Sequence, residues 1–107
     1  FFRDGEYIPL FKVTPIYPRR AQERGIMGYA VVTFTITETG TVENAKPLEG
    51  ACGDPTNPET VFRPCSIFNS AASRAAVKLK YKPKIVDGKA VRVDDVPHKF
   101  TFILEED

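Results

Sequence analysis

Two cysteines are the first residues in this sequence whose type and spacing could do chemistry. Cys52 and Cys65 lie in one segment, 50–66, which also holds three prolines and two glycines. That composition predicts a loop without helical or strand periodicity. A disulfide would close the loop, would stabilise the fold by roughly 3 kcal/mol in the chain-entropy model, and would indicate an oxidising compartment.

Free thiols and redox or metal chemistry are the alternatives for this pair. A redox-active pair is more typical as Cys-x-x-Cys at the start of a helix, where the thiolate is stabilised. A zinc site needs about four ligands, and the sequence has one histidine, His98. The spacing therefore favours a structural disulfide between Cys52 and Cys65, leaves two free thiols open, and predicts no metal or cofactor.

Catalytic groups are sparse elsewhere. His98 is the one histidine and stands beside Pro97, before an apolar strand, whereas a general base needs a pocket and an orienting group. Asp94 and Asp95 are adjacent, so on a strand they would point to opposite faces. The sequence has no phosphate loop and no dinucleotide fingerprint. We therefore expect an interaction domain and not an enzyme; a small redox or hydrolytic enzyme would require reactive thiols.

Composition bounds the remaining possibilities. The chain has 107 residues, of which 42% are hydrophobic and 27% charged, so we expect a single domain over 1–107. The formal net charge is +1, whereas nucleic-acid binders need a clear basic excess. The lysines at 78, 80, 82 and 84 have a structural reason at a helix C-terminus, so we expect no nucleic-acid partner.

The first third of the chain predicts an arm, a short helix and a strand. Residues 1–13 read as an extended arm or edge strand, because Pro9 cannot donate to a ladder. Pro18 and Gly25 bracket a short helix over 18–24 with Ala21 facing inward. Strict alternation predicts a strand over 28–37, with Ala30, Val32, Phe34 and Ile36 facing the core and a half-solvated second face.

The rest predicts a hairpin, a second helix and a final strand. A turn at 38–40 leads to a strand over 41–48, which Pro47 ends or places at an edge. Apolar residues at helical spacing predict a helix over 67–79, capped by Ser66 or Asn69. Asp87-Gly88 marks a turn, residues 94–97 interrupt the chain, and 100–104 is the last strand.

These elements predict a two-layer α+β domain. It would contain a small antiparallel sheet of about three strands plus the N-terminal arm, with two helices packed on one face. Such a sheet leaves an exposed edge, which must be protected or used.

The order of several short motifs resembles the C-terminal domain of TonB-type energy transducers. The motifs are Tyr17-Pro18, Arg19-Arg20-Ala21, Arg24-Gly25, Gly28, Phe34, Gly40-x-Val42, Phe68, Ala71-Ala72, Tyr81-Lys-Pro83, Asp87-Gly88 and Phe100-Thr-Phe102-x-Leu104. Together they cover residues 7–105. No single motif is specific, but their order and spacing are.

The resemblance implies a periplasmic domain anchored in the inner membrane by an N-terminal helix that lies outside this chain. An ExbB/ExbD-like proton-driven complex would act through that missing region. The domain would capture the TonB box of outer-membrane transporters and transmit energy for uptake of iron-siderophores, haem or vitamin B12. Partner binding would occur by strand addition, which suits an extended peptide. A related periplasmic adaptor that binds another envelope partner is the alternative.

The resemblance also implies site residues. The backbone of the last strand, at Lys99, Phe100, Thr101, Phe102 and Ile103, would receive the box. Secondary contacts would come from Thr14, Tyr17, Pro18 and Arg20, with Arg20 facing the transporter plug. Thr14 stands where well-known members carry glutamine. The loop 50–66 is longer than in many members, and either touches a partner or is a passive insertion. An open edge also allows a homodimer.

Overall fold

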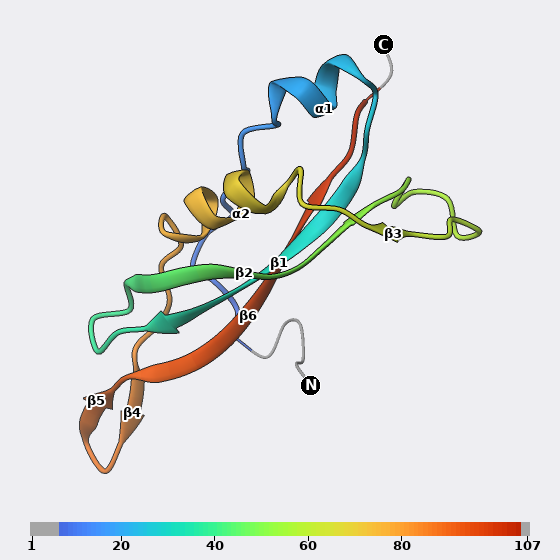
Figure 1. The fold of residues 1–107 in the computed structure, drawn as a ribbon. Coiled ribbons are helices and arrows are strands. Elements are labelled where there is room, and N and C mark those ends of the chain that lie inside the picture. Colours follow the sequence, from blue (N-terminus) through green and yellow to red (C-terminus); the bar gives the residue numbers. More distant parts are fainter. Residues whose placement is uncertain (1–6, 106–107) are drawn as a thin grey trace.

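Three long antiparallel strands run through the centre of the computed structural model, which describes residues 7–105. They are β1 (Gly28–Ile36), β2 (Val42–Cys52) and β6 (Val93–Phe102), and a two-residue strand, β3 (Arg63–Pro64), pairs with the end of β2. The sheet order is β3-β2-β1-β6, which puts β1 in the middle and β6 at one edge (Figure 1). The expected α+β fold with a small antiparallel sheet is confirmed.

The alternation in β1 produces the expected core face. Ala30, Val32, Phe34 and Ile36 are all at most 2% exposed. The second face is less solvated than predicted, since Val31 is also buried. The register explains this burial, because Val31 lies opposite Lys99 of β6 and Glu49 of β2. Long side chains on both flanking strands can cover a β-branched residue between them.

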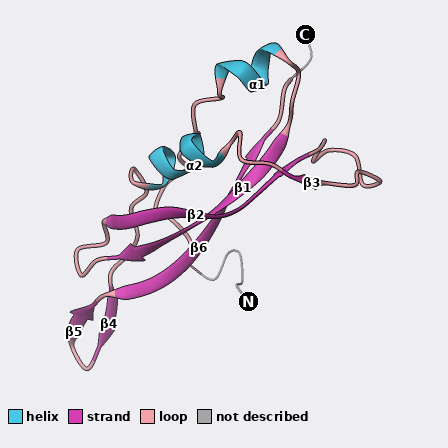
Figure 2. Ribbon diagram, viewed as in Figure 1, coloured by secondary structure: helices cyan, strands magenta, loops and turns pink. Residues whose placement is uncertain are grey.

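Two helices lie on the same side of the sheet, as expected (Figure 2). The first, α1 (Arg19–Glu23), follows Pro18 and ends before Gly25, whose φ of +68° suits a position after a helix. Ala21 in α1 is fully buried, as predicted from the sequence.

The second helix, α2 (Asn69–Ala76), is shorter than the predicted 67–79. After Ala76 the chain tightens, because the N–H groups of Lys78 and Leu79 donate to carbonyls three residues earlier. The expected side-chain cap by Ser66 or Asn69 is wrong, since no side-chain hydrogen bond caps this helix. The backbone carbonyl of Ser66 accepts from the Asn69 N–H instead.

Proline does not end β2. The strand passes through Pro47 and continues to Cys52, with an irregularity that leaves Leu48 as an extra residue between the pairs Val32–Pro47 and Val31–Glu49. The prediction of an irregular loop over 50–66 is therefore wrong at both ends, because 50–52 belong to β2 and 63–64 form β3. The part without strand structure projects from the sheet (Figure 1).

The last strand begins seven residues earlier than predicted. Residues 94–97 do not interrupt it, because a bulge absorbs the two aspartates: Ile36 pairs with Val93 and Phe34 with Val96. Asp95 takes a φ of +56°, and Asp94 Oδ1 accepts a hydrogen bond from Thr35 Oγ1 at 2.8 Å. The strand ends at Phe102, so the final residues of the predicted 100–104 lie beyond it.

A separate hairpin joins α2 to β6. It consists of β4 (Lys84–Val86) and β5 (Lys89–Val91), joined by the predicted Asp87-Gly88 turn. Both turn residues have positive φ, 50° and 79°, which suits a two-residue hairpin. The hairpin projects beyond the main sheet (Figure 1).

The core lies between the sheet and the helices. Phe68, just before α2, stacks on Phe102 of β6 with ring centroids 4.4 Å apart. Ala72 and Ala76 are fully buried, and their small side chains let α2 approach the sheet closely. The molecule is elongated, with extents of 49 × 25 × 23 Å. Within the described residues, the arm has no strand and makes one recorded backbone hydrogen bond, from the Leu10 N–H to the Lys80 carbonyl; residues 1–6 of the predicted arm lie outside them.

Candidate functional site

The outer edge of β6 is open. Within residues 7–105, β6 pairs only with β1 and ends the strand order, so its other side has no strand partner. Four of the five predicted capture residues, at 99–102, lie in this strand. Ile103 follows directly after the strand and its side chain is 44% exposed. Such an edge presents backbone N–H and C=O groups to another chain.

The N-terminal arm forms the second wall of a groove beside this edge. Residues 8–9 and 11–13 of the arm, the following residues 14–15, Leu79, residues 98–101 and Ile103 line a cavity of about 630 Å³. Ile8, Leu10 and Phe11 in the arm expose at least half of their side chains. The sequence predicted an extended arm, but not that it would line the candidate site.

Alternation divides the roles of the residues along β6. Phe100 and Phe102 point into the core and are 4% and 2% exposed, so their side chains serve packing. Lys99 and Thr101 are exposed on the opposite face. The β6 edge therefore presents mainly backbone groups, together with the exposed side chains of Lys99 and Thr101.

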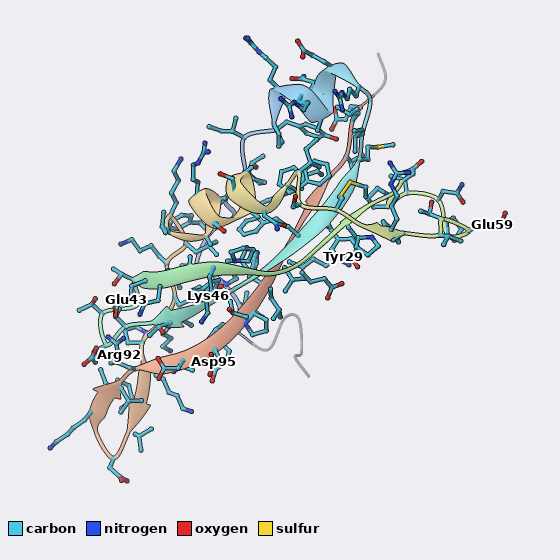
Figure 3. The ribbon with its side chains drawn as sticks, in the orientation of Figure 1. Tyr29, Glu43, Lys46, Glu59, Arg92 and Asp95 are labelled. Atoms are coloured by element: carbon cyan, nitrogen blue, oxygen red, sulfur yellow. A yellow bond between two sulfur atoms is a disulfide. The ribbon has the colours of Figure 1, made fainter. Side chains whose placement is uncertain are left out.

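A small polar network covers the helix-free face near this edge. Tyr29 Oη donates to Glu49 Oε2 at 2.8 Å, and this hydrogen bond, with desolvation and the Glu49 charge, raises the pKa of Tyr29. Lys99 Nζ lies 4.4 Å from the centre of the Tyr29 ring. The network links all three long strands, because Glu49 is in β2, Tyr29 in β1 and Lys99 in β6. The side chain of Tyr29 is labelled in Figure 3.

The predicted secondary residues separate into structural and exposed groups. The Tyr17 ring meets Phe68 and Phe102 edge-on, with centroids 5.8 and 5.7 Å away, and its hydroxyl donates to the Ile26 carbonyl. Burial raises the pKa of Tyr17. Pro18 starts α1. These two residues hold the short helix against the core.

Thr14 and Arg20 are exposed but do not lie together. Thr14 lines the groove beside β6 and also a second groove that faces α2. Arg20 lies on α1 and lines neither groove. The second groove, bounded by 14–19 and α2, was not predicted from the sequence; the exposed apolar residues Ile16 and Val77 are the signal that could have indicated it.

The cysteines form the predicted disulfide. Cys52 at the end of β2 and Cys65 after β3 have Cα atoms 5.7 Å apart. The bond fixes the base of the projecting loop, and the Cys65 N–H donates to the Gly50 carbonyl. Inside the loop, Asp54 accepts hydrogen bonds from the hydroxyl and then the backbone N–H of Thr56, and these lower the pKa of Asp54.

Other polar groups have local roles. The His98 ring packs against Phe100 with centroids 4.7 Å apart, and Asp94 is bonded to Thr35. Across the part of the chain that the structure describes, no three His, Cys, Asp or Glu residues gather as a metal site. No helix among those residues is long and apolar enough to span a membrane.

In a comparison with known protein families, one family model matches residues 13–104. The matching family is described as Gram-negative bacterial TonB protein C-terminal. The protein TonB of Pseudomonas aeruginosa is 33% identical over 88 residues, which are 82% of this chain and 22% of that protein. The chain thus spans about a fifth of the length of this curated relative.

Solved structures agree with this match. The solution structure of the Pseudomonas aeruginosa TonB C-terminal domain superposes with a TM-score of 0.64 at 30% identity, covering 98% of this chain and 93% of that one. The TonB2 protein of Vibrio anguillarum gives a TM-score of 0.60 at 31% identity, covering 99% and 89%. These matches confirm the resemblance indicated by the sequence motifs and the expectation of a non-enzymatic domain.

Proposed function

Because this chain belongs to the family of Gram-negative bacterial TonB protein C-terminal domains, we propose that it is the partner-binding domain of a TonB-like energy transducer. The domain works in the periplasm, and an upstream inner-membrane helix joins it to ExbB/ExbD-like proteins. It captures the TonB box of outer-membrane transporters. The energy it passes on drives uptake of cargo such as iron-siderophores, haem or vitamin B12.

The open edge of β6 is the observation that carries this proposal. An extended box segment can add to it as a further antiparallel or parallel strand, inside the groove that the arm and β6 form. Backbone hydrogen bonds then supply affinity with little demand on side-chain identity. One such domain can therefore serve several transporters. The disulfide agrees with an oxidising compartment such as the periplasm.

The burial pattern of β6 makes this a backbone-reading site. Phe100 and Phe102 cannot turn toward a partner without leaving the core, where Phe102 stacks on Phe68. The peptide therefore meets the outward-facing N–H and C=O groups within 99–103, in a groove that Leu79 and His98 also line. Thr14 in the arm contributes a hydroxyl on the opposite wall.

The experiment is a titration of isotope-labelled protein with short TonB-box peptides, followed by the backbone amide signals in NMR. We expect the largest shifts along 98–103 and in the arm at 11–15, and none in the loop 53–62. A scrambled peptide tests how strongly binding depends on the sequence of the box. No shifts at millimolar peptide would remove the proposal and favour an adaptor for another envelope partner.

A pair of N-methylated peptides provides the sharp control. In an added strand, only alternate peptide N–H groups face the sheet edge. Methylating that set should abolish binding, whereas methylating the other set should leave the affinity within a factor of two or so of the parent peptide. Equal loss from both sets would contradict strand addition.

A further inference from the structure

A second groove lies between residues 14–19 and the outer side of α2. It encloses about 680 Å³, and Ile67, Ala71 and Ala75 contribute an apolar floor. Two large apolar side chains stand at its rim, with Ile16 78% exposed and Val77 53% exposed. Isolated exposed apolar residues are ordinary on a protein surface, but here they flank a formed groove.

All charged side chains that line this groove are cationic. They are Arg19 from α1, Arg74 from α2 and Lys78 just after α2, and the lining includes no aspartate or glutamate. Arg74 Nη2 donates to Ser70 Oγ at 2.7 Å, which orients the guanidinium along the helix. Among the described residues, none of the three cations is recorded in an ion pair. Because no carboxylate neutralises them, the groove attracts negative charge.

The walls give the groove a linear shape. Ala71 and Arg74 lie three residues apart on one side of α2, and Ile67 before the helix and Lys78 after it extend the lining at its two ends. The facing wall is an extended segment stiffened by Pro15 and Pro18. A groove of about 680 Å³ between a helix and an extended segment has room for several side chains of a peptide, and its proline-stiffened wall lowers the entropy cost of binding.

We propose that this groove binds a peptide segment in which apolar side chains are interspersed with aspartate or glutamate. The apolar side chains cover Ile16 and Val77, while the carboxylates meet Arg74 and Lys78. This site is separate from β6 and reads side chains, whereas the β6 edge reads backbone. It therefore adds selectivity among partners to the function proposed above. Thr14 and Pro15 line both grooves, so a single partner chain can reach both.

The test uses a labelled short peptide of leucines spaced by glutamates and the same peptide with glutamines, titrated by fluorescence anisotropy. The glutamate peptide should bind, and its affinity should fall steeply with added salt. Reversing both charges, Arg74→Glu with Lys78→Glu, should weaken binding at least tenfold. Lys82→Glu with Lys89→Glu is the matched control, because both lysines are exposed and line neither groove, and it should change binding little.

Several outcomes would overturn the inference. Equal affinity for the glutamate and glutamine peptides would remove the charge argument, and unchanged binding by the Arg74→Glu, Lys78→Glu variant would remove the site. Binding of anionic phospholipid vesicles that the same variant abolishes, with no peptide binding, would assign the groove to a membrane. Ile16→Ser independently tests the apolar contact and should also weaken binding of the glutamate peptide. A TonB-box peptide that fails to bind β6 would remove the proposed function while leaving this result intact.

Discussion

At the scale of residues, Tyr17 shows how a motif position can be structural. Its ring packs between Phe68 and Phe102, and its hydroxyl donates to the Ile26 carbonyl. We predict that Tyr17→Phe lowers the free energy of unfolding by about 1 kcal/mol, because the ring contacts remain and one hydrogen bond is lost. Urea unfolding at neutral pH measures this. Tyr17→Ala should cost clearly more, since it also removes the ring, and equal costs would contradict the packing role.

Because the pKa of Tyr17 is raised, the stability difference between the wild type and Tyr17→Phe depends on pH. The folded state holds the phenol proton more tightly than the unfolded state, because burial disfavours the phenolate. The resulting stability is fully present below the ordinary value of 10.0 and is lost as the pH rises through the raised pKa. Unfolding measured at neutral and at alkaline pH should therefore show the wild-type advantage over Tyr17→Phe shrinking at high pH.

Arg20 is the exposed member of the same motif. It lies on α1 and lines neither groove, so we expect it to make no contact with a short box peptide. We predict that Arg20→Glu leaves the affinity for a box peptide unchanged but weakens binding to an intact transporter several-fold, through a lost charge contact. Surface plasmon resonance on both ligands distinguishes the two effects. Loss with the peptide as well would place Arg20 at the box site.

At the scale of elements, the disulfide supports the short strand β3. Only Arg63 and Pro64 pair with β2, which is too little to hold a strand on its own. We predict that Cys52→Ser with Cys65→Ser lowers the free energy of unfolding by about 3 kcal/mol. Amide exchange at Cys65, which donates to Gly50, should accelerate. Urea unfolding and hydrogen exchange measure the two effects.

The opposite edge of the sheet provides the control for that variant. In the sheet order β3-β2-β1-β6, both β2 and β1 lie between β3 and β6. The disulfide joins the end of β2 to Cys65, so β1 separates it from β6. Box-peptide affinity should therefore stay unchanged in the serine variant. A matched loss of peptide binding would show that the disulfide supports the whole sheet and not one end of it.

Local patterns predicted the elements better than their lengths. Alternation located β1, and proline and glycine located α1, because these signals act on neighbouring residues. The start of β6 was missed because Asp94, Asp95 and Pro97 look like breakers, yet a bulge absorbs the aspartates and an edge strand tolerates a proline. The arm beside β6 and the groove on α2 were missed because they depend on packing between distant segments, which periodicity does not record.

At the scale of the whole molecule, the two sides of the sheet have different surroundings. The projecting disulfide loop lies on the β3 side, and the open edge of β6 lies on the other (Figure 1). The three long strands follow the elongated body, so an added strand can run beside β6 over much of its ten residues. A surface of this kind accepts any extended chain, including another copy of the protein.

That shared edge gives a prediction about self-association. Two copies joined antiparallel through β6 would form a symmetric dimer with one continuous sheet. Both Lys99 side chains would then lie on the same face, so we expect added salt to strengthen the dimer by screening their repulsion. Under the proposed strand addition, a box peptide would compete for the same backbone groups and should convert dimer to monomer, whereas the inactive N-methylated peptide should not. Sedimentation velocity across protein and peptide concentrations measures this. A dimer that persists at saturating peptide must use another surface, and the β6 edge would then be free for transporters in both copies.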